Sequence, residues 1–319
     1  MIDYRDQVQI QLREIGISLF GECNNRCDFC FNKQHYTDLY SSININQVLS
    51  NTIKAIDCIS NQTKHINFTL IGGELFQSKF KQDYYNKLFQ FINTIRNHCK
   101  ELNIDYKIGI TTNCLCVNDL VIDFLYKANI NSLRCSFDFE GRFKSDKIID
   151  NWFDNINKLS KFNPIVELTT MKSNLIKVFN NDPIWIKLYQ RYSIEFNNFE
   201  DVSIEKYRVI EIDLIEFYKF LIDNYPNVAN VLQLKDILTN TKTIRNCRHS
   251  IVVTKDYIKF DCCNRNKAIN NFIKNKQCFS CDYYNKCGLT CFREFQNNDI
   301  CYLKQSLKYY ESWLQTNRF

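Results

Sequence analysis

The sequence predicts an α/β fold, a partial (β/α)6 barrel of the TIM type followed by a small, loop-rich, cysteine-rich domain. Two observations carry this prediction. Short β-type runs alternate with longer helical runs up to residue 196, and after Asn246 hydrophobic periodicity fades while cysteines and aromatic residues crowd together. Alternating strands and helices imply a parallel sheet with right-handed crossovers. An open doubly wound sheet is the alternative, and in both folds the chemistry lies at the carboxyl ends of the strands.

The expected elements follow from the spacing of apolar residues, which repeats every second residue in strands and about every 3.6 residues in helices. Strands are expected at residues 15–20, 65–71, 106–111, 132–137, 165–170 and 192–196. Helices are expected between them at residues 46–60, 84–99, 118–127, 148–161 and 183–190. Two further helices, at 213–225 and 303–314, are expected to link the barrel to the cysteine-rich region and to end the chain.

The composition fits a globular chain with a sizeable core. Of 319 residues, 45% are hydrophobic and 24% are charged, which argues against wholesale disorder. The net charge of +6 is spread along the chain without a run of like charges, so a nucleic-acid partner is not expected. The first residues lack the pattern of a signal peptide, and no apolar run is long enough to span a bilayer. A cytoplasmic location without a membrane partner is therefore expected.

Sixteen cysteines in a chain expected in a reducing compartment indicate metal or cluster ligation rather than disulfides. Cys23, Cys27 and Cys30 form a Cys-x3-Cys-x2-Cys triplet on the loop after the first strand. Three thiolates can hold three irons of a [4Fe–4S] cube and leave the fourth iron open, as a substrate-binding cluster needs. A zinc site with a distant fourth ligand is the alternative. Six scattered cysteines are expected, for the most part, to be small buried hydrophobic residues.

The triplet, together with Phe29 directly before its third cysteine, resembles the signature of the radical S-adenosylmethionine (SAM) superfamily. The resemblance implies that the open iron binds the amino and carboxylate groups of SAM. Electron transfer from the reduced cluster would cleave a sulfur–carbon bond of SAM, and the resulting 5′-deoxyadenosyl radical would abstract hydrogen from a substrate. Phe29 is expected among the residues that bind this cofactor.

Two strand ends resemble family segments that bind SAM. Gly72, Gly73 and Glu74, after the second strand, resemble the segment that binds the amino group. Glycines there allow a sharp turn and a close approach of the backbone to a ligand. Ser136 and Asp138, at the end of the fourth strand, resemble the stretch that reaches the ribose.

Four other polar residues are expected near the cofactor. Arg142 or Lys144 is expected to pair with the SAM carboxylate, because arginine forms two-pronged bonds to such groups. Asn113 and Asn174 follow the third and fifth strands, where the family often has polar contacts to SAM. An ordinary turn asparagine and a solvated loop charge are the alternatives for these positions.

A second block of cysteines resembles the SPASM extension of radical SAM enzymes that mature peptides and proteins. Its central Cys-x2-Cys-x5-Cys-x3-Cys spacing matches without change. The block departs from the family at Tyr257, where a glycine is usual, and this is expected to alter a hairpin turn. A zinc-ribbon-like module with structural zinc is the alternative.

The resemblance implies two auxiliary [4Fe–4S] clusters, three clusters in all. The first would be held by Cys247, Cys262 and Cys291, and the second by Cys278, Cys281, Cys287 and Cys301. The first set lacks a fourth cysteine, so an open iron, a non-cysteine ligand or Cys263 is expected to complete it. Three segments follow from the two blocks: a barrel (1–205), a linking helical segment (206–240) and a SPASM-like domain with a C-terminal helix (241–319).

The resemblance implies an enzyme that abstracts hydrogen from a precursor peptide and leaves a crosslink, an epimer or an oxidised side chain, as in the maturation of ribosomal peptide natural products. A radical SAM enzyme for a small molecule, such as a sugar or cofactor precursor, is the alternative. A zinc-dependent nucleic-acid-binding module is a third possibility. The sequence identifies no catalytic acid, base or radical donor.

Three partners are expected on the same grounds: a precursor peptide, a flavodoxin or ferredoxin as electron donor, and a separate protein that binds the leader of the peptide. Only 22 residues precede Cys23, too few for the N-terminal winged-helix module that grips leaders in many such enzymes, so leader binding is expected to need either such a separate protein or the barrel surface.

Overall fold

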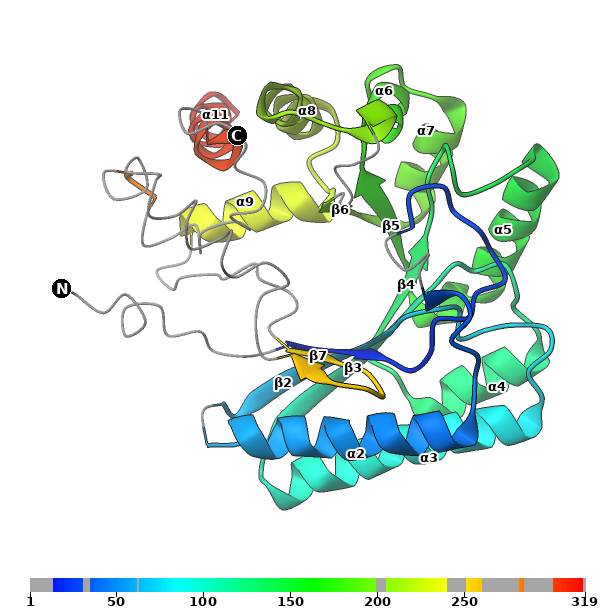
Figure 1. Ribbon diagram of the computed structural model, residues 1–319. Helices are drawn as coiled ribbons and strands as arrows, with labels where there is room; N and C mark the ends of the chain where they lie inside the picture. The colour runs from blue at the N-terminus through cyan, green and yellow to red at the C-terminus, as the bar shows by residue number, and fades with distance from the viewer. Residues whose placement is uncertain are drawn as a thin grey trace.

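The computed structural model describes residues 14–30, 35–61, 63–198, 205–239, 251–259, 281–283 and 301–317. Its centre is one curved sheet with helices on the outer side (Figure 1). Six strands pair in parallel and in chain order: β1 (Glu14–Ser18), β2 (His65–Ile71), β3 (Asp105–Thr112), β4 (Ser132–Ser136), β5 (Ile165–Thr170) and β6 (Ser193–Asn198). The predicted α/β class and the six-stranded parallel sheet of a partial TIM-like barrel are confirmed.

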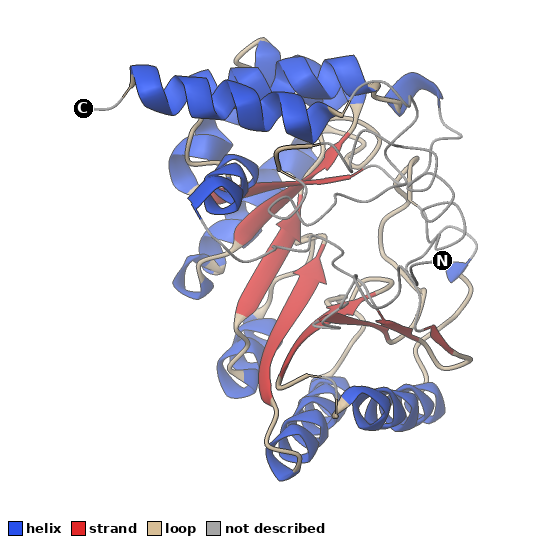
Figure 2. Cartoon of the chain, turned by 90° about the vertical axis from the view of Figure 1, so that its left-hand side faces the viewer, coloured by secondary structure: helices blue, strands red, loops and turns tan. Residues whose placement is uncertain are grey.

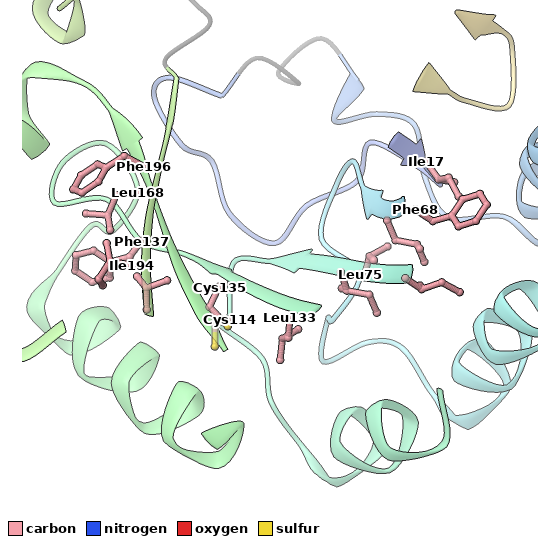
Figure 3. Close-up of a cluster of buried hydrophobic side chains, with 14 of the residues drawn as sticks. Ile17, Phe68, Leu75, Cys114, Leu133, Cys135, Phe137, Leu168, Ile194 and Phe196 are labelled. Carbon is pink, nitrogen blue, oxygen red and sulfur yellow. The ribbon is translucent and has the colours of Figure 1, made fainter. Parts of the chain in front are cut away.

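Alternation within the strands separates a helix-covered face from an inner face. In β2, Ile66, Phe68 and Leu70 are buried, while the residues between them are only half-buried. The buried side chains fill the layer between sheet and helices, as the close-up in Figure 3 shows for Leu133, Cys135 and neighbouring residues. This period of two residues is what the sequence pattern predicted.

Six described helices connect successive strands between β1 and β6: α2 (Ser42–Ile59), α3 (Gln82–Glu101), α4 (Asp119–Ala128), α5 (Asp146–Lys158), α6 (Lys172–Phe179) and α7 (Pro183–Arg191). Side chains cap three of them: Ser41 before α2, Asn118 before α4 and Asp182 before α7. Each cap satisfies a backbone N–H that the first turn leaves without a partner. Helix α6 was not predicted, because it is short and begins in the Lys-Ser-Asn stretch that reads as a turn.

A hairpin far along the chain extends the sheet. Strand β7 (Ile251–Val253) pairs in parallel with β1, and β8 (Ile258–Lys259) pairs antiparallel with β7. Asn51 of α2 donates to the carbonyl groups of Thr254 and Lys255, at 3.0 and 3.1 Å, and so anchors the turn. Strands of three and two residues are too short to show a periodic pattern, so they were missed. The division of the chain at residues 205 and 240 stays a prediction, but this hairpin is part of the barrel sheet.

Three helices close the upper side of the barrel in Figure 1: α8 (Glu211–Asn224), α9 (Ala229–Thr239) and α11 (Tyr302–Thr316). Helix α11 packs against α8 and α9. Figure 2 shows these helices and those of the barrel on the outer side of the strands. In the part of the chain that the structure describes, no helix has both the length and the apolar character needed to cross a bilayer.

The amide of Asn230 in α9 ends the sheet at β6. Its Oδ1 accepts from Phe196 N at 2.7 Å, and its Nδ2 donates to Phe196 O at 3.0 Å. One side chain therefore makes the two bonds that a neighbouring strand would make. An open strand edge invites pairing with another chain, and this amide covers it.

We expect Asn230→Ala to lower the free energy of unfolding by about 1–3 kcal/mol, because the buried N–H and C=O of Phe196 lose their partners. Urea denaturation under anaerobic conditions measures the loss. The control is Asn224→Ala, which removes an exposed amide that bonds only its own helix. Equal midpoints for the two variants would contradict the role given to Asn230.

Candidate functional site

The cysteine triplet lies on the loop that leaves the carboxyl end of β1. Cys27 is buried, and Cys23 and Cys30 are partly buried. Burial is the main cause that raises the pKa of the Cys23 thiol to about 11, and the nearby thiols of Cys27 and Cys30 contribute to this rise. Burial also raises the pKa of Cys27, which Arg142 opposes. The three thiols are thus close enough to interact, and metal binding would displace the protons of those that are protonated.

The donor set fits a four-iron cube. Each thiolate of such a cube binds a different iron, so the sulfurs need not converge on one point. Among the residues that the structure describes, no three His, Cys, Asp or Glu side chains are gathered tightly enough to hold a single ion. The sulfurs of Cys23 and Cys27 also accept N–H groups, which favour the charged thiolate that iron requires.

The Gly72-Gly73 turn packs directly against the start of the cysteine loop. Gly73 N donates to Phe20 O at 2.7 Å. A Cβ on Gly73 would lie 1.9 Å from Glu22 O, and Gly72 has a φ of +122°. Both positions therefore exclude a side chain. The glycines bring the end of β2 against the backbone that carries the triplet.

Glu74 joins the ends of β2 and β3. Its side chain is 2% exposed. Oε1 accepts from Phe76 N at 2.8 Å and Thr112 Oγ1 at 2.7 Å, and Oε2 accepts from Asn113 N at 2.6 Å. Burial raises the pKa of Glu74 from 4.5 to about 7, while the three hydrogen bonds act in the opposite direction.

Asp138 joins the ends of β4 and β5 in the same way. Its fully buried carboxylate accepts from Thr169 N at 2.8 Å and from Asn174 Nδ2 at 2.7 Å. The other oxygen accepts two N–H groups of Arg142, each at 2.7 Å. Asp138 thus fixes a guanidinium whose charge reaches Cys27.

Arg142 lies over Phe29, with the guanidinium carbon 5.4 Å from the ring centroid. Phe29 also meets Tyr207 edge to face at 5.7 Å. Gly141, at φ +73°, lets the loop pass close to both rings, because a Cβ there would lie 2.5 Å from the Tyr207 hydroxyl. The loop after β4 is therefore held against the cysteine loop, and Asp28 N donates to Gly141 O at 2.8 Å.

The structure brings most of the predicted cofactor residues together at one end of the barrel. Around the triplet lie Phe29, Gly72, Gly73, Glu74, Asn113, Asp138, Arg142 and Asn174. The carboxylates and the Asn174 amide are buried and bonded to protein groups, so they brace the loops. Ser136 is half-buried at the end of β4, and Lys144 is exposed. That these residues contact SAM stays a prediction.

Two ligands predicted for the second auxiliary cluster are described, and they lie near each other. Burial raises the pKa of the Cys301 thiol, and the neighbouring Cys281 raises it further. Cys301 Sγ also accepts from Lys304 N at 3.4 Å, at the start of α11. The other predicted ligands, and the substitute Cys263, lie outside the described residues: Cys247, Cys262, Cys278, Cys287 and Cys291.

Sequence reasoning missed two residues beside the triplet. Asn25 lies between the first two cysteines and donates to sulfur from both its backbone and its side chain. Burial raises the pKa of the Tyr36 hydroxyl, and the neighbouring Cys30 contributes to this rise. An amide inside a cysteine motif is a usable signal for the first. No local pattern marks the second.

An ionic group lies on the inner face of the barrel, below the strand ends. Arg134 Nε is 3.5 Å from Glu167 Oε1 and 3.4 Å from Glu195 Oε2. Gln233 of α9 donates to the other oxygen of Glu195 at 3.4 Å. The interior next to β4, β5 and β6 is therefore polar, in contrast to the apolar outer face.

Comparisons with known proteins agree with this architecture. A family model described as a 4Fe-4S single cluster domain matches residues 16–148, which include the whole triplet. No curated protein matches the chain. The chain is similar to native anSMEcpe with bound AdoMet and Cp18Cys peptide, at 15% identity and a TM-score of 0.64, over 96% of this chain and 97% of that chain. It is also similar to Streptococcus suis SuiB bound to precursor peptide SuiA, at 15% identity and a TM-score of 0.52, over 87% and 71%.

The chain shares the partial-barrel fold of these structures, and its cysteine triplet lies inside a stretch that matches a 4Fe–4S single cluster domain. The fold and the cluster-binding stretch expected from the cysteine motifs are therefore confirmed. The match also favours iron–sulfur ligation over zinc for the triplet.

The raised pKa of Glu74 predicts a pH dependence. The folded state holds this proton to about pH 7 and the unfolded chain only to about pH 4.5, so the contribution is present below pH 4.5 and is lost as pH rises through 7. We expect the urea midpoint to fall between pH 5 and pH 7, with a slope of at most about 1.4 kcal/mol per pH unit. Glu74→Gln removes this slope and costs about 1–3 kcal/mol, because its NH2 group faces Asn113 N–H. An unchanged slope in the variant would refute the assignment.

Proposed function

We propose that this protein is a radical SAM enzyme that acts on a peptide. The observation that carries the proposal is the triplet of Cys23, Cys27 and Cys30, three partly or fully buried thiols on the loop at the carboxyl end of β1. The match of residues 16–148 to a 4Fe–4S domain supports it. When bound, the cluster and SAM supply the 5′-deoxyadenosyl radical that abstracts hydrogen from the substrate.

The residues of this chain would hold that cofactor pair. The three thiolates would bind three irons and leave the fourth for the SAM methionine group. The Gly72-Gly73 turn and the end of β3 keep the loop in position through Glu74. Ser136, at the end of β4, would bind the ribose of SAM.

Arg142 supplies a fixed positive charge beside the cysteine loop. Its side chain is 13% exposed and is held by Asp138. A guanidinium whose position is fixed before binding pairs a carboxylate at a smaller entropic cost. Arg142 is therefore better suited than the exposed Lys144 to pair the carboxylate of SAM.

A peptide is the favoured substrate class because of the two similar structures. The structure of anSMEcpe contains a bound Cp18Cys peptide, and the structure of SuiB contains the bound precursor peptide SuiA. We infer that this chain likewise admits a peptide segment to the inner face of the barrel. A low-potential flavodoxin or ferredoxin would supply the electron, and a separate protein would hold the leader.

We further propose that the C-terminal cysteines hold two auxiliary clusters, giving three in all. The nearness of Cys281 and Cys301, twenty positions apart in the sequence, supports the second of these. When bound, these clusters would accept an electron from the substrate or hold the substrate in place.

Replacing Cys23, Cys27 and Cys30 together by Ala tests the first proposal. We expect anaerobically reconstituted protein to fall from about 12 to about 8 irons and to lose 5′-deoxyadenosine formation from SAM. Iron analysis and chromatography of the nucleoside measure both. The control is Cys58→Ala, which removes an exposed cysteine of α2. Undiminished 5′-deoxyadenosine in the triple variant, or about two zincs with little iron in the wild type, would end the enzyme proposal.

Cys281→Ala tests the auxiliary clusters. We expect about 4 irons to be lost and peptide turnover to fall at least tenfold, while 5′-deoxyadenosine formation without peptide persists, because the triplet cluster is intact. Mass spectrometry of the peptide from the genomic neighbourhood measures turnover. An equal loss of both activities would mean that the cysteine array is structural. Modification of a small molecule in place of the peptide would mean that the substrate is a small molecule.

A further inference from the structure

Hydrogen-bond donors reach two sulfurs of the triplet. Cys23 Sγ accepts from Asn25 N at 3.4 Å and from Asn113 Nδ2 at 3.7 Å. Cys27 Sγ accepts from Asn25 Nδ2 at 3.6 Å. These donors come from the cysteine loop itself and from the end of β3.

The orientation of both amides is fixed by their other contacts. Asn113 Oδ1 accepts from Leu115 N at 3.0 Å, so its NH2 group must face the loop and the sulfur of Cys23. Asn25 Oδ1 accepts from Arg26 N at 2.9 Å, so its NH2 group must face Cys27. An amide is ambiguous only where its partners do not distinguish oxygen from nitrogen, and here they do.

The environment makes these contacts strong. Asn25 and Asn113 are 9% and 6% exposed. A hydrogen bond in a buried site of low dielectric constant is worth more than the same bond in water. The charge of Arg142 acts on Cys27 in the same direction, because it too favours the charged sulfur.

We propose that the Asn25 and Asn113 amides set the reduction potential of the cluster on the triplet. The inference rests on the proposed function, which places a cluster there. Reduction adds one electron from an external low-potential donor and makes the sulfurs more negative. Donors stabilise this form more than the oxidised form, so they raise the potential. Without them the same electron donor reduces a smaller fraction of the protein.

The two asparagines are positioning residues, since they act through the cysteine ligands. Asn113 also links the cluster to the rest of the site. Its backbone N–H is bound by the carboxylate of Glu74, and its side chain donates to Asn24 Oδ1 at 2.6 Å. The donor at Cys23 is therefore held by the loop that follows β2 as well as by its own strand.

The double variant Asn25→Ala/Asn113→Ala tests the amides without adding charge. We expect the equilibrium constant to fall about tenfold, a shift of about 59 mV to more negative potential. Asn24→Ala is the control, since this exposed amide makes no contact with sulfur. Asn24→Ala removes an acceptor that competes with the Cys23 sulfur for the Asn113 NH2 group. The reduction potential of the triplet cluster in this variant is therefore expected to stay the same or to rise.

The measurement is a reductive titration of the reconstituted full-length protein with dithionite, followed by electron paramagnetic resonance. The triplet signal is the one that the Cys23/Cys27/Cys30 triple Ala variant lacks. If that variant lacks no signal, the proposed function fails. If the signal is present and its potential in the Asn double variant equals that of the wild type, only the tuning proposal fails. Iron content is measured in parallel, and variants that assemble no triplet cluster would show that the side chains place the ligands, which also overturns tuning.

Discussion

The buried carboxylate of Glu74 is the interaction on which the site depends. It binds Phe76 N, Thr112 Oγ1 and Asn113 N, and so ties the loop after β2 to the end of β3. The glycines before it pack onto the backbone that leads into Cys23. Loops at strand ends are the mobile part of a barrel, and three hydrogen bonds to one buried acceptor remove that freedom. The cysteine loop is therefore supported from two neighbouring strands.

Asp138 likewise ties together the loops at two strand ends, those of β4 and β5. It binds the end of β5 through Thr169 and Asn174, and it fixes Arg142 over Phe29. The carboxylates of Glu74 and Asp138 both accept hydrogen bonds from protein groups. They therefore fix the loops, and other residues are left to bind a ligand. The groups that the braces position are an N–H donor at Cys23 and a guanidinium near Cys27, and these are the groups able to act on a cluster and its ligand.

An open sheet of six parallel strands has two edge strands, β6 and β1, and a different element contacts each of them. Asn230 hydrogen-bonds the backbone of β6, and the β7–β8 hairpin pairs with β1. The inner face between them is polar, with Arg134 between two glutamates. An interior of this kind suits a bound polar substrate, whereas an apolar interior would close on itself.

The sequence by itself determined the order of strands and helices and the position of the triplet, because period-two and helical patterns and a Cys-x3-Cys-x2-Cys spacing are local. It also placed Glu74 and Asp138 at the site. Only the tertiary structure decided what they do there, since burial and the choice of partners depend on neighbouring strands. The donor from Asn113 to Cys23, the cap by Asn230 and the hairpin on β1 join segments distant in sequence or too short for a pattern. Such contacts are set by the way the sheet closes, and no local signal encodes them.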